Sequence, residues 1–292
     1  MRALLIANPS AGQRRAGAAS FSDVWPELRD TLARADFAIE VAETAVPTPT
    51  ARELAERAVH EGYEAVLVAG GDGTVADAAS ALLHTNGTLG ILPFGSVMNI
   101  ANSIPVPVDP AEAAAVIARK RVRRIDVGDV ADRLFFEVAG VGLDAAAVGI
   151  ARLAERGNVR GALARLRIAL QRESHWISVT ADGRRPVRHR ALQVLVINAR
   201  YYFLGIPVVP DADIADGLLD VAVFPRMGQL RLVVHLLAIA IGRRPPERPV
   251  VYRGREISIE APERVRVHAD NVLAGTLPQA FRCQHAALAV FA

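Results

Sequence analysis

The residues best suited to chemistry are five in a row, Gly70-Gly71-Asp72-Gly73-Thr74. They follow the apolar run Ala65–Ala69 and open a segment with helical spacing. Glycines let a backbone turn sharply and approach a ligand closely, and the N–H groups at a helix start favour phosphate. A plain strand-to-helix turn needs only one glycine, so the sequence predicts a phosphate-binding loop. Asp72 is suited to bind a metal or orient a hydroxyl, and Thr74 to donate to a phosphate oxygen.

A second group of polar residues lies far along the chain, where Asp211, Asp213, Asp216 and Asp220 crowd one short segment. Carboxylates are hard oxygen donors of the kind that Mg²⁺ prefers. The alternative is an ordinary tight turn at Asp216-Gly217 before a strand. The sequence favours a metal site here. No pair of histidines and no Cys–His cluster has the spacing of a zinc site.

The glycine loop must be held by alternating strands and helices. Short apolar runs predict strands, and segments with helical spacing lie between them. The predicted strands are Ala3–Ala7, Phe37–Val41, Ala65–Ala69 and Leu89–Leu92, and the predicted helices are Val24–Ala35, Thr50–Glu61 and Thr74–Leu83. This order indicates a parallel sheet with crossover helices, whose ligands bind at the carboxyl ends of the strands.

After about Val122 the pattern changes to short β-type runs separated by turns such as Asp182-Gly183. The predicted strands are Arg121–Val127, Leu134–Val138, Trp176–Ala181, Ala191–Ile197, Leu219–Phe224, Glu256–Glu260, Val265–Ala269 and Ala287–Phe291. Two helical stretches, Ala145–Arg172 and Met227–Gly242, interrupt them. We therefore expect an α/β domain over 1–124 and a mostly antiparallel, β-rich domain over 125–292, from which the last strand can return to the first domain.

The amino-acid composition argues against several classes of protein. The chain has 292 residues, 51% of them hydrophobic and 22% charged, which is typical of a folded chain with a large core. The 34 basic and 31 acidic residues are interspersed, so a nucleic-acid partner is disfavoured, and a single cysteine excludes an internal disulfide framework. The start has no signal-peptide pattern, and the longest apolar stretch, Leu230–Ile241, is about half of a membrane span. We expect a cytoplasmic protein.

Several motifs together give the chain a family resemblance. It resembles the diacylglycerol kinase catalytic-domain family, which includes bacterial lipid kinases and sphingosine kinases and shares its glycine block with the NAD kinases. The matching blocks, in the family's order, are Asn8-Pro9-Ser10-Ala11-Gly12, Gly70 to Thr74, Pro93-Phe94-Gly95-Ser96, Gly140 to Ala145 and Asp213 to Asp220.

This resemblance implies an ATP-dependent kinase that phosphorylates a lipid hydroxyl such as that of diacylglycerol, in a cleft between the two domains. The positions that match ATP contacts are Asn8, Thr44, Gly70, Gly71, Asp72, Gly73, Thr74, Val75, Ala76 and Ser96. Asp72 would position the metal–ATP complex. The resemblance also implies a structural Mg²⁺ held by Asp213, Asp216 and the backbone carbonyl of Leu218.

Two departures from the family pattern bear on activity. Met98 and Asn99 stand where the family often has Asn-Asp, which removes a carboxylate. Asp270-Asn271-Val272 stands where the family has Asp-Gly-Glu, and that Glu is the family's proton acceptor. Valine cannot accept a proton, which leaves Asp270 as the nearest candidate base. Two alternatives stay open: a soluble NAD kinase-like enzyme, and a nucleotide- or lipid-binding relative with impaired catalysis.

The arginines between Arg152 and Arg172 recur at roughly helical spacing among leucines and alanines. They indicate either a solvated helix face or an amphipathic helix seated on anionic lipid. The second interpretation predicts peripheral contact with the inner face of the membrane. The sequence does not choose between a monomer and a homodimer.

Overall fold

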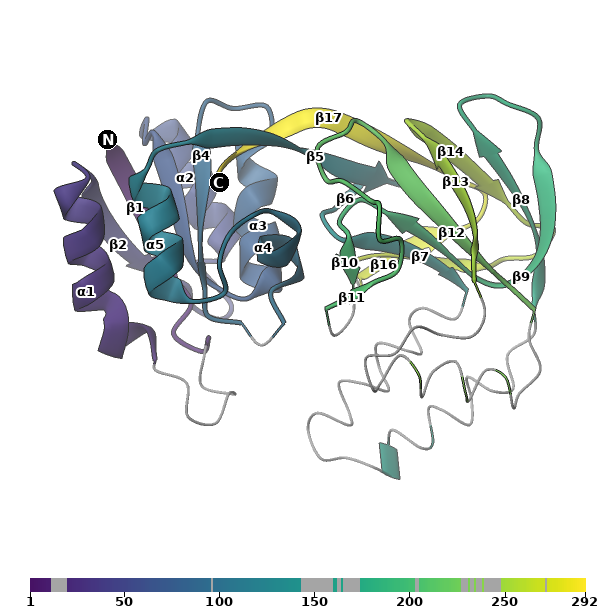
Figure 1. Ribbon diagram of the computed structural model, residues 1–292, viewed down its shortest axis with the longest axis horizontal. Helices are drawn as coiled ribbons and strands as arrows, with labels where there is room; N and C mark the ends of the chain where they lie inside the picture. Colours follow the sequence, from purple (N-terminus) through teal and green to yellow (C-terminus); the bar gives the residue numbers. More distant parts are fainter. Residues whose placement is uncertain are drawn as a thin grey trace. The chain divides into compact units, whose positions relative to one another are not determined.

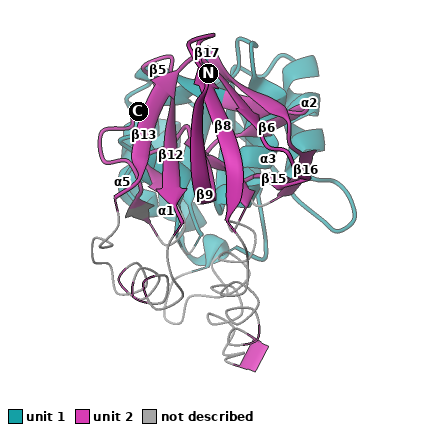
Figure 2. Cartoon of the chain, turned by 90° about the vertical axis from the view of Figure 1, so that its right-hand side faces the viewer, with its two compact units in different colours: residues 1–127, 285–292 teal, residues 128–284 magenta. Residues whose placement is uncertain are grey.

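A computed structural model of the protein describes residues 1–11, 20–95, 97–142, 174–202, 205–226, 248–270 and 272–292, together with positions 160, 161, 164, 231, 234 and 238. The chain divides into two compact units, which are coloured separately in Figure 2. Unit 1 comprises residues 1–127 and 285–292, and unit 2 comprises residues 128–284. The chain leaves unit 1 along β5 (Val122–Val130) and returns along β17 (Gln279–Phe291).

Unit 1 is built on a parallel sheet in the order β4-β3-β1-β2 (Figure 1). Its strands are β1 (Arg2–Ala7), β2 (Ala38–Glu43), β3 (Ala65–Gly70) and β4 (Thr88–Pro93). Every residue of β3 and β4 is buried, which explains their continuous apolar sequences. Pairings such as Leu4 with Val66 and Leu67 with Gly90 keep all four strands in parallel register. The carboxyl ends of the strands therefore lie along one edge of the sheet.

The helices of unit 1 pack as two pairs. One pair is α1 (Phe21–Arg34) with α5 (Pro110–Ala118), and the other is α2 (Ala51–His60) with α3 (Asp72–Leu82). The short helix α4 (Asn99–Ser103) contacts α3. Side chains fix where two of these helices begin: the Thr50 hydroxyl accepts the N–H of Glu53, and the Asp109 carboxylate accepts those of Ala111 and Glu112.

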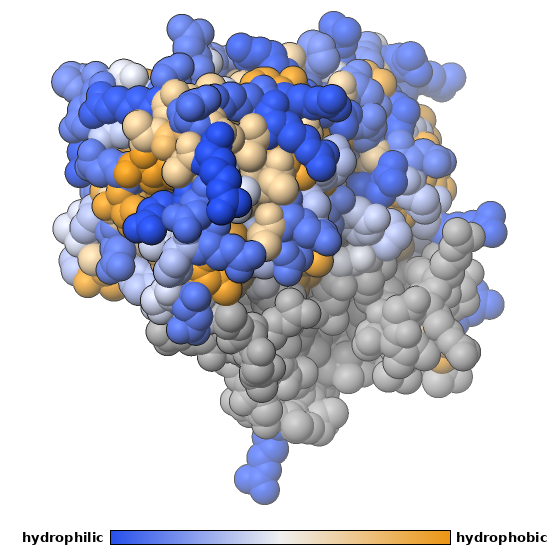
Figure 3. Space-filling model, turned by 60° about the vertical axis from the view of Figure 1, so that its left-hand side comes forward, coloured by the Kyte–Doolittle hydropathy of each residue, from blue (hydrophilic) through white to orange (hydrophobic). Residues whose placement is uncertain are grey.

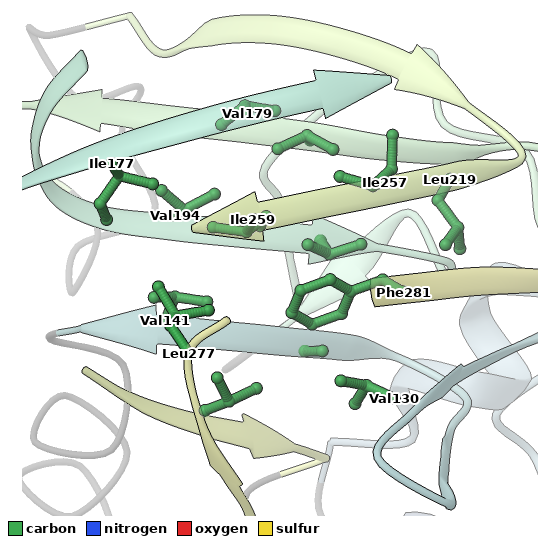
Figure 4. Close-up of a cluster of buried hydrophobic side chains, with 14 of the residues drawn as sticks. Val130, Val141, Ile177, Val179, Val194, Leu219, Ile257, Ile259, Leu277 and Phe281 are labelled. Atoms are coloured by element: carbon green, nitrogen blue, oxygen red, sulfur yellow. The ribbon is translucent and has the colours of Figure 1, made fainter. Parts of the chain in front are cut away.

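Unit 2 is mostly antiparallel. Its elements are β6 (Arg133–Phe135), β7 (Val138–Gly142), β8 (His175–Ala181), β9 (Val187–Ile197), β10 (Tyr201–Tyr202), β11 (Ile206–Pro207), β12 (Leu219–Pro225), β13 (Val250–Gly254), β14 (Glu256–Glu260), β15 (Arg266–Ala269) and β16 (Val272–Thr276). β9 pairs with β7, β8 and β12, all antiparallel. Figure 4 shows the core between these strands, where Phe281 lies among aliphatic side chains such as Val141, Ile257 and Leu219.

The fold class predicted from the sequence is confirmed: a parallel α/β region precedes a mostly antiparallel β region. Two interpretations need correction. The run Leu134–Val138 is not one strand, because the chain turns at Phe136–Glu137 between β6 and β7. Six elements were not predicted from the sequence: α4, α5, β10, β11, β13 and β16. The predicted helices Ala145–Arg172 and Met227–Gly242 lie, except for the isolated positions above, outside the described residues.

Among the residues that the structure describes, no helix has the length and apolar character needed to cross a membrane. On the face shown in Figure 3, hydrophobic residues form small areas separated by hydrophilic ones. Isolated exposed apolar residues of this kind are normal on protein surfaces.

Candidate functional site: the phosphate loops of unit 1

The loops that follow the strands of unit 1 are tied to one another by hydrogen bonds. The N–H of Asn8, after β1, donates to the carbonyl of Ala69 in β3 at 3.0 Å. The N–H of Phe94, after β4, donates to the carbonyl of Gly70 at 3.0 Å. The Asn8 side chain donates to the Thr74 hydroxyl at 2.9 Å. The structure thus brings three of the sequence-predicted loops together at one edge of the sheet.

Thr44 joins the same edge from β2. Its N–H donates to the carbonyl of Ala7 at 2.9 Å, and its side chain is half-buried. Val75 differs from the other predicted ATP residues, because its side chain is buried and its N–H donates to the carbonyl of Gly71. Ala76 is half-buried, and Ser96 lies outside the described residues.

The glycines of this edge occupy two kinds of space. A Cβ on Gly95 would lie 2.6 Å from Met98 Sδ and 2.7 Å from Gly71 Cα, so the backbones of Gly71 and Gly95 approach each other closely. A Cβ on Gly73 would meet no atom within 4 Å. Gly71 is the N-cap residue of α3, and Gly73 lies in that helix's first turn. Gly73 is the exposed residue of this first turn, so open space lies beside the start of α3, a kind of position that can bind phosphate.

Asp72 is held more firmly than a solvated loop carboxylate. Its side chain accepts hydrogen bonds from the N–H groups of Asn99 and Ile100, each at 3.0 Å. These groups begin α4, so Asp72 fastens that helix and the loop after β4 to the glycine loop. Burial raises the pKa of Asp72 above its usual value, while the N–H groups of Ile100, Asn99 and Met98 act in the opposite direction.

In unit 2 the aspartate-rich segment is organised around Arg253, which the sequence reading did not single out. Its guanidinium donates to both carboxylate oxygens of buried Asp220, at 2.9 and 3.1 Å, and to the carbonyl of Asp211 at 3.2 Å. Its Nη1 lies 3.6 Å from Oδ2 of Asp216. Asp220 and Arg253 are directly opposite in the pairing of β12 with β13. Strand β13 was not predicted from the sequence, so nothing in the sequence indicated that Arg253 lies beside the aspartates.

The predicted magnesium ligands sit in two short turns. Oδ1 of Asp213 accepts the N–H of Ala215, and Oδ1 of Asp216 accepts that of Leu218. Burial raises the pKa of Asp216, and the charges of Asp220 and Asp213 add to this rise, against the N–H of Leu218 and the charge of Arg253. Within the described residues no three His, Cys, Asp or Glu side chains form a metal-binding group. The predicted ligands are two carboxylates and one carbonyl, and all three are oxygen donors. Oxygen donors suit a hard cation, which would also offset the repulsion between the two carboxylates.

Asp270 and Val272 bear on the identity of the general base, and they lie in very different surroundings. The carboxylate of Asp270 accepts the N–H groups of Phe136, Glu137 and Val138 at 2.6, 3.0 and 3.1 Å. It therefore fixes the turn between β6 and β7. Val272, in contrast, is 51% exposed on β16, which pairs only with β15 among the described strands.

The described chain combines an α/β unit that carries a glycine loop with an antiparallel β unit. Comparison with known families makes this more specific. Residues 2–130 match the model "Diacylglycerol kinase catalytic domain", and residues 137–292 match "YegS C-terminal NAD kinase beta sandwich-like domain". The chain therefore belongs to the family of bacterial diacylglycerol kinases and YegS-like lipid kinases. Membership in this family implies the use of ATP.

Individual relatives are distant. The chain is 32% identical to a probable lipid kinase YegS-like of Pseudomonas putida over 60% of each chain. It is 29% identical to a diacylglycerol kinase of Mycobacterium tuberculosis over 82% of this chain and 80% of that one. The match thus spans about three fifths of the Pseudomonas relative's length. A crystal structure of a putative diacylglycerol kinase from Bacillus anthracis shares the fold, with a TM-score of 0.78 and 24% identity over 99% of this chain and 97% of that one.

Proposed function

We propose that this protein is an ATP-dependent lipid kinase that transfers the γ-phosphoryl group to a lipid hydroxyl such as that of diacylglycerol. The observation that carries the proposal is the convergence of the loops after β1, β3 and β4 at the exposed first turn of α3. Phosphoryl transfer depends mainly on positioning and on stabilising charge. A set of fixed N–H donors beside an open space supplies both.

The residues divide the work as follows. Gly70 to Thr74 and Ser96 would bind phosphate oxygens, and Asn8 supports them by holding the Thr74 hydroxyl. Thr44, Val75 and Ala76 complete the proposed ATP contacts, Val75 through packing rather than through its N–H, which is already bonded. Asp72 fixes the loop after β4 and would orient the metal–ATP complex. Asp213, Asp216 and the carbonyl of Leu218 would hold a Mg²⁺ ion that supplies structural cross-linking in unit 2.

No residue is assigned as the general base in this proposal. Asp270 is the nearest carboxylate in sequence to Val272, but its oxygens already accept three backbone N–H groups. Losing a general base costs typically ~10²–10⁴-fold in rate. This observation favours a second candidate function, a nucleotide- and lipid-binding relative with impaired catalysis.

A radiolabel transfer assay tests the proposal. The protein is incubated with γ-labelled ATP, Mg²⁺ and, separately, lipids that carry glycerol, sphingoid or sugar hydroxyls, with NAD in a further reaction. Label in a lipid supports the lipid kinase, and label in NAD alone would establish the NAD kinase-like alternative. ATP binding by calorimetry without label in any acceptor would identify the impaired relative.

A further inference from the structure

The β8–β9 hairpin of unit 2 carries an unusual concentration of positive charge. Four arginines lie between the turn and the first half of β9: Arg184, Arg185, Arg188 and Arg190. All four are exposed, and in the described part of the chain none of them has a carboxylate within ion-pair distance. The only acidic residue of the turn is Asp182, and its carboxylate accepts the N–H groups of Arg255 and Glu256.

An exposed tryptophan adjoins these charges. Trp176 of β8 is directly opposite Arg190, and the guanidinium of Arg188 lies 5.5 Å from the centre of its ring. Trp176 keeps 48% of its surface exposed. Figure 2 shows β8 and β9 side by side and facing the viewer. On the far side of β8, Glu260 of β14 is directly opposite Ser178, so an acidic residue lies on the strand beyond β8.

This combination has a physical meaning. Trp176 is about half exposed, and the amphipathic ring of a tryptophan suits the boundary between lipid headgroups and acyl chains. Arginines without acidic partners attract anionic phosphates, and their aliphatic stems lie along apolar surface. A basic patch or a single apolar side chain alone gives weak membrane binding, whereas the two together reinforce each other.

We propose that the β8–β9 hairpin docks on the surface of an anionic phospholipid membrane, with Trp176 entering the interface and Arg184, Arg185 and Arg188 contacting lipid phosphates. The charge complementarity between the arginines and an anionic bilayer is the argument for this occupant. Docking would bring the proposed lipid kinase to its substrate. The biological role of docking therefore rests on the proposed function, whereas membrane binding itself does not.

The first experiment places a reporter at the contact. The chain has two tryptophans, so a Trp25→Phe background leaves Trp176 as the only one. Vesicles of phosphatidylcholine mixed equally with phosphatidylglycerol should shift Trp176 emission to the blue, and pure phosphatidylcholine vesicles should not. Unchanged emission with anionic vesicles would overturn the proposal.

The second experiment removes charge in matched ways. The triple variant Arg184→Gln, Arg185→Gln, Arg188→Gln should bind anionic vesicles on the order of 100-fold more weakly, since each basic side chain near such a surface contributes roughly fivefold. The control variant Arg119→Gln, Arg121→Gln, Arg133→Gln removes the same charge from exposed arginines elsewhere and should weaken binding only slightly. Equal losses in the two variants would show a general charge effect and overturn the hairpin's role, as would equally tight binding to a DNA duplex.

A third measurement separates this inference from the proposed function. Turnover on a short-chain, water-soluble diacylglycerol needs no membrane, so wild type and the hairpin variant should react at the same rate. If wild type phosphorylates no lipid while Trp176 still shifts on anionic vesicles, the docking surface stands and the kinase assignment fails. If turnover is normal and no vesicle binding is seen, the kinase assignment stands and the docking proposal fails.

Discussion

Gly73 and Gly95 both belong to the proposed phosphate loops, but the space beside them is different. The space beside Gly73 is open, whereas the backbone of Gly95 is pressed against Gly71 and the side chain of Met98. An open space within the first turn of a helix is what a bound phosphate would fill. A packed glycine instead keeps two loops together. The same residue type therefore has a proposed ligand role at Gly73 and a structural role at Gly95.

The variant Gly73→Ala should keep or slightly raise stability, by up to ~1 kcal/mol, because alanine is the better helix residue. Its affinity for ATP should fall at least tenfold, since the methyl group enters the proposed phosphate space. Gly95→Ala should instead lower stability by ~1–3 kcal/mol through overpacking. Calorimetry with ATP and denaturant unfolding measure the two effects. Unchanged ATP affinity in Gly73→Ala would show that no phosphate binds there.

Asp72 gives a prediction on stability as well as on activity. Asp72→Ala leaves the N–H groups of Asn99 and Ile100 without their acceptor and should cost ~1–3 kcal/mol of unfolding free energy. Asp72→Asn retains one acceptor oxygen and should lie between Asp72→Ala and wild type. Loss of turnover in Asp72→Asn then reports the missing charge rather than a loosened loop. Asp30→Ala, on an exposed ion pair, is the control and should change stability little. An Asp72→Ala protein as stable as wild type would refute the capping role.

At the scale of elements, contacts between β9 and β13 support the packing of unit 2. His189 Nε2 lies 2.6 Å from the Tyr252 hydroxyl, and the two rings are in edge contact. Arg253, the next residue of β13, holds the carboxylate of Asp220 and the carbonyl of Asp211, which lie at the two ends of the aspartate segment. One short strand thus fixes both a core contact and the proposed metal loop.

Burial lowers the pKa of His189, so below about pH 6.5 the unfolded chain binds a proton that the folded chain resists. The stability from this neutral histidine is present above the unfolded pKa and is lost as the pH falls toward the folded pKa, at no more than ~1.4 kcal/mol per pH unit. His189→Gln should therefore show a smaller fall in stability than wild type between about pH 7 and pH 5. Urea unfolding at several pH values measures this. Parallel pH profiles for the two proteins would contradict the assignment.

The aspartate segment predicts a metal-dependent stability. Mg²⁺ that binds only the folded state stabilises it by ~2.7 kcal/mol at a hundredfold excess over its dissociation constant. Asp216→Asn keeps the acceptor for the Leu218 N–H but loses a proposed ligand charge, so it should abolish most of the rise in melting temperature that Mg²⁺ gives relative to chelator. Asp211→Asn removes a charge from the same segment without touching a proposed ligand and should retain the rise. If Mg²⁺ shifts wild type and Asp216→Asn equally, this segment is an ordinary turn.

At the scale of the whole molecule, family membership favours kinase activity, whereas the absence of the family's Glu disfavours it. The matches to family models together cover almost the entire chain, from residue 2 to residue 292. The position that the resemblance assigns to the family's base is nevertheless occupied by Val272, which is exposed. Because Val272 lies on a strand with one described partner, a larger polar side chain fits there without disturbing a core.

Val272→Glu should raise lipid phosphorylation by roughly 10²-fold if the chain is a weakened kinase, since a carboxylate is restored where the family has one. Turnover on a lipid panel measures this, with Val272→Gln as the control for size and polarity. Asp270→Asn tests the other candidate base, but it also disturbs the turn at Phe136 to Val138, so its unfolding free energy must be measured beside its turnover. Ordinary turnover in wild type that neither substitution changes would exclude this segment as the source of the base.

The sequence determined the features that depend on neighbours along the chain. Apolar runs of four or five residues predicted β1, β3 and β4, and the glycine cluster predicted a loop at the start of α3. Helix α5 also carried a local signal, Asp109 before Pro110, which the reading overlooked. Helix α4 carried almost none, because it has five residues and follows Met98 in a left-handed conformation with a φ of 57°.

Only the tertiary structure decided which distant groups meet. Asp72 caps a helix that begins 27 residues later, Arg253 pairs with Asp220 across 33 residues, and Asp270 holds a turn more than 130 residues earlier. Periodicity and local propensity report the state of a segment but not its partner, because strand pairing is fixed by burial of the whole sheet. The role of a carboxylate depends on that partner. A sequence therefore shows that Asp72 and Asp270 are present, and the fold shows that both already hold backbone N–H groups.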